Sequence, residues 1–235
     1  MYTQNLVEVR NLKKGYGAGH EVYEDLNLSI GGGRIIGLLG PNGSGKTTLL
    51  KMLAGILTPD AGEILINGNK IGPQTKADVA YLSERTYLNE SLKVKTVIQM
   101  FDDFYEDFDK ERAYQMFRSL NIDVNTMIKK LSKGNKEKVQ LVLVMSRNAK
   151  LYLLDEPIAG VDPAARDFIL NTILSNYNKG AALIISTHLI TDIERILDEV
   201  IMVRNGRILT HENAEGLRRR NNKSIDQIFR EEFRC

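Results

Sequence analysis

A glycine-rich octapeptide contains the residues of this sequence that point most directly to chemistry. Residues 40–47 read Gly40-Pro41-Asn42-Gly43-Ser44-Gly45-Lys46-Thr47 and fit the pattern G-x-x-x-x-G-K-[ST]. In such a loop the glycines let backbone N–H groups point inward at phosphate oxygens, and the positive end of the following helix adds to the attraction. Lys46 supplies a point charge for the outer phosphates, and the hydroxyl of Thr47 can hold a Mg²⁺ ion that bridges them. The loop therefore predicts a binding site for a nucleotide phosphate chain.

Two adjacent carboxylates follow an apolar run further along the chain. Residues 151–157 read Leu-Tyr-Leu-Leu-Asp-Glu-Pro, and a buried strand delivers the residues at its C-terminal end to the crevice where open α/β sheets bind ligands. Beside a phosphate loop, we expect Asp155 to hold Mg²⁺, usually through water, and Glu156 to orient and deprotonate an attacking water. The alternative is a solvent-exposed turn at a strand end, which we would prefer if the sequence had no phosphate loop.

The elements that must position these residues alternate between short apolar runs and helical patterns. This alternation favours a mainly parallel sheet flanked by helices. The candidate strands are residues 34–39, 79–82, 151–154 and 182–186, and the first candidate helix is 48–54. Near the end of the chain, Asn205-Gly206 predicts a β-hairpin between residues 199–203 and 207–210.

Two regions depart from this pattern. Strand-like runs at residues 6–10, 24–30 and 63–67, separated by glycine-rich turns, predict a small antiparallel β layer at about 1–33 and 60–75. Residues 93–145 hold no convincing strand and predict an inserted helical sub-domain. Apolar side chains recur there at helical spacing, and we interpret this stripe as core rather than as a ligand surface: Val97, Met100, Phe101, Phe104, Phe108, Met116, Phe117 and Leu120.

The last residues, 217–235, predict a helical tail. Its apolar side chains recur at helical spacing, and we expect them to pack back on the domain rather than on a partner: Ile225, Ile228, Phe229 and Phe233. Arg218, Arg219 and Arg220 form a basic run that we expect on a solvated helix face, with lipid headgroups as the alternative contact.

Composition sets limits on the class of protein. The 235 residues, 43% hydrophobic and 26% charged, match one globular domain and exclude disordered and fibrous classes. A net charge of +2 predicts no strong field for nucleic acid, and no nucleic-acid partner is expected. A single cysteine, Cys235, excludes a disulfide framework and a cysteine-based zinc site. Residues 1–10 lack the pattern of a signal peptide, and the apolar runs are too short for a bilayer span, so we expect a chain that does not cross a membrane by itself.

A further run before the two carboxylates resembles the hallmark of the ATP-binding-cassette (ABC) ATPases, L-S-G-G-Q. Residues 131–140 read Leu-Ser-Lys-Gly-Asn-Lys-Glu-Lys-Val-Gln and keep Leu131, Ser132 and Gly134, whereas Lys133 and Asn135 depart from the pattern. The resemblance extends over residues 6–210 in the order of the family. Gly15-Tyr16-Gly17 is similar to the A-loop, Ala159-Gly160-Val161-Asp162 to the D-loop, and Ser186-Thr187-His188 to the switch histidine. Residues 79–84 are similar to the Q-loop, with Glu84 where the family usually has Gln.

The resemblance implies a P-loop NTPase core that binds ATP and Mg²⁺ and hydrolyses ATP. Tyr16 is implied to stack on adenine, and Val22 and Thr48 are implied to lie beside the nucleotide. His188 is implied to sense the γ-phosphate. In isolation, Tyr16 would be interpreted as an ordinary turn residue and His188 as a core histidine. Thr47, Asp155 and Glu84 are the implied metal ligands. Ser132 and Gly134 are implied to contact ATP bound by a partner, with the helix near Asn135 adding its dipole.

The family also implies partners. Two cassettes bind ATP head to tail, as a homodimer or a heterodimer, and integral membrane permease subunits dock beside residues 84–92, which places the chain at the cytoplasmic face of the membrane. A bacterial export transporter is expected from the short architecture, the L-S-K-G form and the segment 224–229. A soluble ABC ATPase without a permease is the alternative, although such proteins usually carry two cassettes or a long coiled-coil insertion. Another alternative is a catalytically inactive regulatory subunit, and the presence of Glu156 and His188 argues against it.

Overall fold

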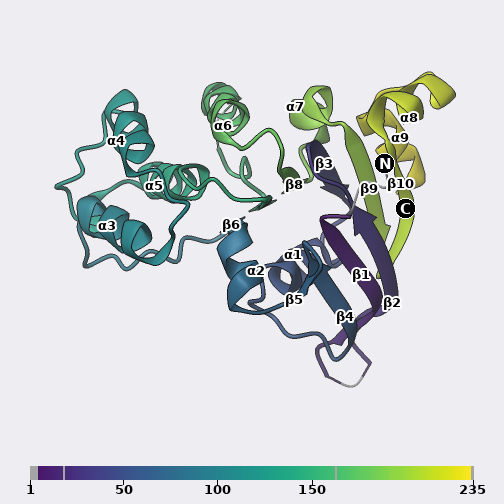
Figure 1. Ribbon diagram of the computed structural model, residues 1–235. Coiled ribbons are helices and arrows are strands. Elements are labelled where there is room, and N and C mark those ends of the chain that lie inside the picture. The colour runs from purple at the N-terminus through teal and green to yellow at the C-terminus, as the bar shows by residue number, and fades with distance from the viewer. Residues whose placement is uncertain (1–4, 18, 162, 234–235) are drawn as a thin grey trace.

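Two β-sheets and a helical lobe make up the computed structural model of the protein, which describes residues 5–17, 19–161 and 163–233 (Figure 1). Two residues singled out above, Asp162 and Cys235, lie outside these ranges. The first sheet has the order β2-β1-β4-β5, and all its pairings are antiparallel. Its strands are β1 (Val7–Gly15), β2 (Glu21–Ile30), β4 (Ala61–Ile66) and β5 (Asn69–Lys70). This sheet confirms the antiparallel layer, although the chain after β5 turns into the helix α2 (Pro73–Asp78).

The second sheet positions the chemistry. Its order is β10-β9-β3-β8-β7-β6, and every neighbouring pair is parallel except the hairpin β9–β10. The strands are β3 (Arg34–Leu39), β6 (Val79–Leu82), β7 (Leu151–Asp155), β8 (Ala182–Ser186), β9 (Glu199–Arg204) and β10 (Arg207–Asn213). Every residue of β7 and β8 is buried, since helices or the first sheet cover both faces, and this explains their continuous apolar sequences. The four strand predictions and the hairpin are confirmed.

The helices fill both faces of this sheet. Helix α1 (Lys46–Leu53) lies between the two sheets, where Leu49, Leu50 and Met52 share one core cluster with residues of β1, β2 and β3. A second cluster on the opposite face contains α6 (Pro163–Asn176) and α7 (Ile190–Ile193), which is followed by the 3₁₀ turn η2 (Glu194–Ile196). The phosphate loop therefore precedes a helix that is buried between two sheets.

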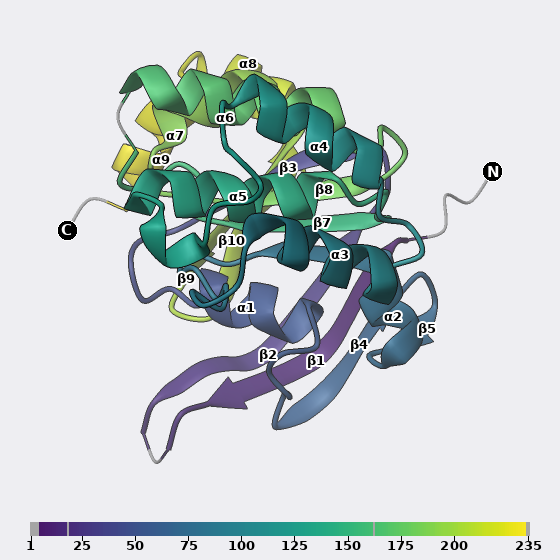
Figure 2. The same cartoon turned by 90° about the vertical axis from the view of Figure 1, so that its left-hand side faces the viewer.

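A helical lobe follows β6 and holds the third core cluster. It consists of α3 (Val94–Phe104), α4 (Lys110–Ser119), the 3₁₀ turn η1 (Ile128–Lys130) and α5 (Lys133–Met145). Figure 1 shows the lobe on the far side of the molecule from β1 and β2, and Figure 2 views it face on. Helix α5 belongs to both parts, because Val139, Val142 and Leu143 pack in the lobe while Leu141 and Met145 pack against the parallel sheet.

The interpretation of the aromatic stripe was only partly right. Val97, Phe108 and Phe117 are buried in the lobe as expected, but Met100 is 42% exposed and Phe104 is 77% exposed. Helix α3 packs in the lobe core through Val94, Val97 and Ile98, whereas Met100 and Phe104 extend beyond that contact. These two side chains line an apolar groove described below.

The C-terminal tail packs back on the domain, as predicted. It begins at residue 214, earlier than the expected 217, because the side chain of Asn213 accepts a hydrogen bond from the Gly216 N–H and caps α8 (Ala214–Asn221). In α9 (Ile225–Glu232), Ile225 is fully buried in the main core, and the other apolar residues of the stripe pack against it. The arginine run forms ion pairs with Glu212 and Glu215 of the same chain. Within the described ranges, no helix has the length and apolar character needed to cross a bilayer.

Candidate nucleotide site

The phosphate loop joins β3 to α1 in a conformation that requires glycine at particular positions. Gly45 adopts a φ of 102°, and a Cβ atom there would lie 2.7 Å from the hydroxyl of Tyr23 and 2.8 Å from Cγ1 of Val22. At Gly40 a Cβ atom would come within 2.4 Å of the Val203 carbonyl oxygen. Side chains at these positions would clash with the neighbouring strands and displace the loop. The glycines thus keep the backbone close to β2 and β9.

Lys46 is buried beneath the loop, with 7% of its surface exposed. Its ammonium group donates hydrogen bonds to the carbonyl oxygens of Gly40, at 2.8 Å, and Pro41, at 3.1 Å. Burial lowers the pKa of Lys46, and the nearby carboxylates of Glu156 and Asp155 act in the opposite direction. A buried cation held by two carbonyl dipoles is available to an anion that enters the loop.

The C-terminal edge of the parallel sheet brings the carboxylates to this loop. Asp155 pairs in register with Ser186, whose hydroxyl donates to Asp155 Oδ1 at 2.6 Å. The hydroxyl of Thr47 donates to the same oxygen at 3.0 Å. The hydroxyl of Tyr81 in β6 donates to Asp155 Oδ2 at 3.5 Å, and burial together with the Asp155 charge raises the pKa of Tyr81. Asp155 is therefore held by hydroxyl groups from three elements.

Glu156 stands at a strained backbone position directly after β7. Its φ is 50°, in the left-handed region, and its N–H donates to the carbonyl oxygen of Ser186 at 3.0 Å. A non-glycine residue in this region costs about 1 kcal/mol. The strained turn directs the side chain into the cavity, where Glu156 Oε2 lies 3.1 Å from Nδ1 of His188. The tertiary structure thus places the predicted base beside the predicted switch histidine.

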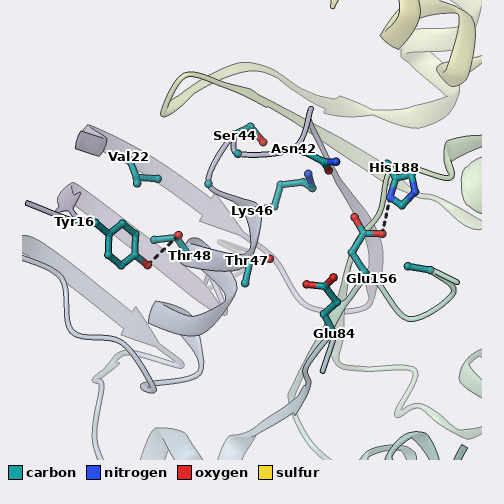
Figure 3. Close-up of a pocket in the computed structure, with 13 residues that line it drawn as sticks. Tyr16, Val22, Asn42, Ser44, Lys46, Thr47, Thr48, Glu84, Glu156 and His188 are labelled. Carbon is teal, nitrogen blue, oxygen red and sulfur yellow. Dashed lines mark hydrogen bonds and ion pairs between the residues drawn. The ribbon is translucent and has the colours of Figure 1, made fainter. Parts of the chain in front are cut away.

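One cavity collects most of the predicted site residues (Figure 3). Its volume is about 540 Å³. Figure 3 shows Tyr16 at one end and Glu84, Glu156 and His188 at the other, with Lys46 between them. The tyrosine hydroxyl lies 3.3 Å from the hydroxyl of Thr48. The lining residues are Tyr16, Val22, Asn42, Gly43, Ser44, Gly45, Lys46, Thr47, Thr48, Glu84, Glu156, Ala159 and His188.

Ser132 and Gly134 do not line this cavity. Ser132 is the N-cap of α5, and its hydroxyl accepts a hydrogen bond from the Asn135 N–H at 3.3 Å. The helix therefore begins at Lys133, two residues before the expected Asn135. Lys133 is exposed on this first turn. Within one chain the two halves of the predicted site remain apart.

The oxygen donors at the sheet edge suit magnesium. Thr47 and Asp155 present a hydroxyl and a carboxylate within 3.0 Å of each other, and Mg²⁺ prefers one or two such ligands together with water and phosphate oxygens. Glu84 reaches the same cavity from the segment after β6. Among the described residues, no three His, Cys, Asp or Glu side chains gather closely enough to hold a metal ion alone.

Sequence reasoning missed two residues of this region, Tyr81 and Gln140. Tyr81 occupies the penultimate position of a predicted strand, so its place beside the strand that ends in Asp155 could have indicated the contact. Gln140 lies within the hallmark run and is buried with 2% exposure. A helical spacing alone gives no sign that this amide contacts a segment more than fifty residues away.

The fold and the cavity together define a P-loop nucleotide-binding protein, because a phosphate loop between strand and helix faces two carboxylates at the same edge of a parallel sheet. The sequence model described as "ABC transporter" matches residues 23–159, more than half of the chain. The chain belongs to the ABC transporter family, and it is an ATP-binding ATPase of that family.

Related proteins and structures agree with this assignment. The SkfA peptide export ATP-binding protein SkfE of Bacillus subtilis is 34% identical over 87% of this chain and 87% of its own length. The lipopolysaccharide export system ATP-binding protein LptB of Escherichia coli is 32% identical over 86% of this chain and 88% of its own. A solved structure of an ATP-binding subunit of an ABC transporter, 29% identical, superposes with a TM-score of 0.86 and covers 96% of this chain and 98% of that one.

Proposed function

We propose that this chain is the ATP-hydrolysing subunit of a membrane transporter that exports its cargo, and that it works as a head-to-tail dimer. The observation that carries the proposal is the convergence of Lys46, Glu156 and His188 on one cavity. Export is supported by the two relatives above, whose names assign them to peptide export and to lipopolysaccharide export. Such a subunit would act at the cytoplasmic face of the membrane.

The chemistry follows from the contacts of the phosphate loop. When phosphates enter, Lys46 exchanges the carbonyl oxygens of Gly40 and Pro41 for phosphate oxygens. Thr47 and Asp155, with Glu84 nearby, would hold Mg²⁺, which neutralises developing charge on the phosphates. Glu156 accepts the proton of the attacking water, and His188, 3.1 Å away, keeps the carboxylate in position and contacts the γ-phosphate.

The dimer would complete the site. Ser132 and Gly134 lie at the exposed start of α5, outside the cavity of their own chain. In a head-to-tail pair they reach the nucleotide held by the partner, and the N-terminal end of α5 adds a favourable dipole. A monomer would then bind ATP and hydrolyse it slowly. Since this chain has both halves, a homodimer with two working sites is consistent with its sequence.

The membrane partner would occupy an apolar groove between the core and the helical lobe. The groove has a volume of about 770 Å³, and its walls include the exposed Met100 and Phe104 of α3 and Tyr87 of the segment after β6. Two lysines, Lys51 and Lys76, also line it and add positive charge to the groove. An apolar helix face flanked by an acidic residue complements such a groove. We assign this occupant to a membrane subunit.

The variant Glu156→Gln tests the hydrolytic mechanism. The amide keeps the shape of the side chain and cannot accept the proton of water, so turnover should fall about 10²- to 10⁴-fold while ATP is still bound. Gel filtration with ATP and Mg²⁺ should show a dimer that forms only weakly with the wild type. If the variant stays monomeric with bound ATP, or hydrolyses ATP within a few fold of wild type, the mechanism is wrong.

The groove needs a separate experiment. Phe104→Asp should reduce the recovery of integral membrane protein in pull-downs from native membranes, because it puts a charge on the exposed apolar wall. Phe168→Asp, at a partly exposed phenylalanine of α6 outside the groove, is the matched control and should leave recovery unchanged. Recovery of ribosomes without any membrane protein would contradict the transporter assignment and favour a soluble ABC ATPase.

A further inference from the structure

A single buried amide connects the helix of the hallmark run to the segment after β6. The side chain of Gln140 on α5 is 2% exposed. Its Nε2 donates to the carbonyl oxygen of Ser83 at 2.9 Å and to the Ser83 hydroxyl at 3.3 Å. Its Oε1 accepts from the hydroxyl of Thr86 at 3.1 Å and from the N–H of Tyr87 at 3.4 Å. Both ends of the amide are thus bonded to the same short segment, residues 83–87.

This segment faces two different sites. Glu84 lines the nucleotide cavity, whereas Ser83 and Tyr87 line the apolar groove. The Ser83 hydroxyl also donates to the carbonyl oxygen of Arg85 at 2.5 Å, which closes the turn that carries Glu84. A displacement of the segment would therefore move Glu84 at one site and the groove wall at the other.

The chemistry of an amide suits this place. Only a side chain that is donor and acceptor at once can bond the Ser83 carbonyl and the Tyr87 N–H together. The Ser83 carbonyl and the Tyr87 N–H would both lose this partner if the amide were absent. Gln140 also lines a second cavity, of about 420 Å³, together with Glu84 and Glu156, two residues that line the nucleotide cavity as well.

We propose that Gln140 is a positioning residue that locks residues 83–87 to α5, so that Glu84, the groove wall and the start of α5 with Ser132 move as one unit. The inference rests on the proposed function, in which a membrane subunit occupies the groove and the hallmark run contacts the nucleotide of the partner. It identifies the residue that couples the groove to the hallmark run in this chain. The coupling is made by a side chain on α5 and not by flexibility of residues 83–87. Gln140 acts through Glu84 and does not touch the reacting atoms.

The test uses the full chain with Gln140→Met, which keeps the length of the side chain and removes the amide. We expect kcat for ATP hydrolysis to fall about tenfold, because Glu84 is no longer held in position, while the dissociation constant for ATP, set by the phosphate loop, stays within about twofold. Hydrogen exchange at the Tyr87 N–H should become faster. Gln115→Met, at an exposed glutamine on α4, is the matched control and should change none of these quantities.

A double-mutant cycle separates positioning from a general structural role. If Gln140 acts through Glu84, the double variant Gln140→Met/Glu84→Ala should lose no more activity than Glu84→Ala alone, and the Mg²⁺ concentration for half-maximal activity should rise in both single variants. Additive losses would overturn the proposal. So would a Gln140→Met variant with wild-type kcat and wild-type exchange at residues 83–87.

Two further measurements keep the outcome decisive. If Gln140→Met does not fold, hydrogen exchange of the wild type tests the proposal. ATP should change the protection of residues 83–87 and of the first turns of α5 in parallel. A change in only one of these two segments would overturn the proposal. Wild-type protein without any ATP turnover would instead contradict the proposed function. The two failures are therefore distinguishable.

Discussion

Removal of the Lys46 ammonium should weaken ATP binding by an amount that the contacts allow us to work out. At an effective dielectric constant of about 20, a unit charge about 3 Å from a phosphate charge contributes roughly 5 kcal/mol. Against this, Lys46 gives up its charge-assisted hydrogen bonds to Gly40 and Pro41, which are worth about 1.5 kcal/mol each at the lower end of their range. The difference is about 2 kcal/mol, so Lys46→Ala should raise the dissociation constant for ATP about 30-fold.

Isothermal titration calorimetry with Mg-ATP measures this directly. Lys129→Ala, at an exposed lysine in η1, is the control for loss of a positive charge and should bind as the wild type does. Thermal unfolding shows whether the Lys46 variant remains folded. A folded variant whose affinity stays within about threefold of wild type would refute the reasoning, since the phosphates would then be held by backbone dipoles alone.

Three further predictions follow from individual contacts. Tyr16→Ala should weaken ATP binding by about 1–3 kcal/mol in calorimetry, as expected for loss of base stacking; an unchanged affinity would remove Tyr16 from the site. Gly45→Ala should lower the unfolding temperature, because alanine disfavours a φ of 102° and its methyl group would clash with Tyr23. A higher unfolding temperature would contradict the close packing of the loop on β2. Burial and then the Arg34 charge lower the pKa of His211 below 6.5, so the unfolded chain takes up the proton first. Unfolding free energy should therefore fall as pH drops below about 6.5, and His211→Gln should reduce that dependence in urea titrations.

Most of the framework was accessible from local sequence patterns. The strands β7 and β8 are buried on both faces, so their sequences are apolar up to the polar residue that ends each strand, and they are easy to recognise. The phosphate loop depends on backbone geometry that only a few residue types allow, which is why its residues carry so specific a signal. Tyr16, Glu156 and His188 were placed by motif order, and the structure brings all three to one cavity.

Other features depended on which surfaces meet. The spacing of Met100 and Phe104 is the same as that of buried neighbours on α3, and the pattern could not show that the facing surface is left uncovered. Likewise, Tyr81 reads as an ordinary strand residue until the sheet order puts β6 beside β7. Periodicity describes the face of an element, whereas burial depends on its neighbours.

The sequence by itself determined the chemistry of this protein: the phosphate loop, the order of its motifs and the strands that end in Asp155 and Ser186. These features are local, because they follow from the conformations and hydrogen-bonding groups of a few consecutive residues. The tertiary structure alone decided that Gln140 bonds residues 83–87 and that an apolar groove stays open beside them. Contacts between segments far apart in the chain arise only when sheet and lobe pack together, so no local pattern encodes them.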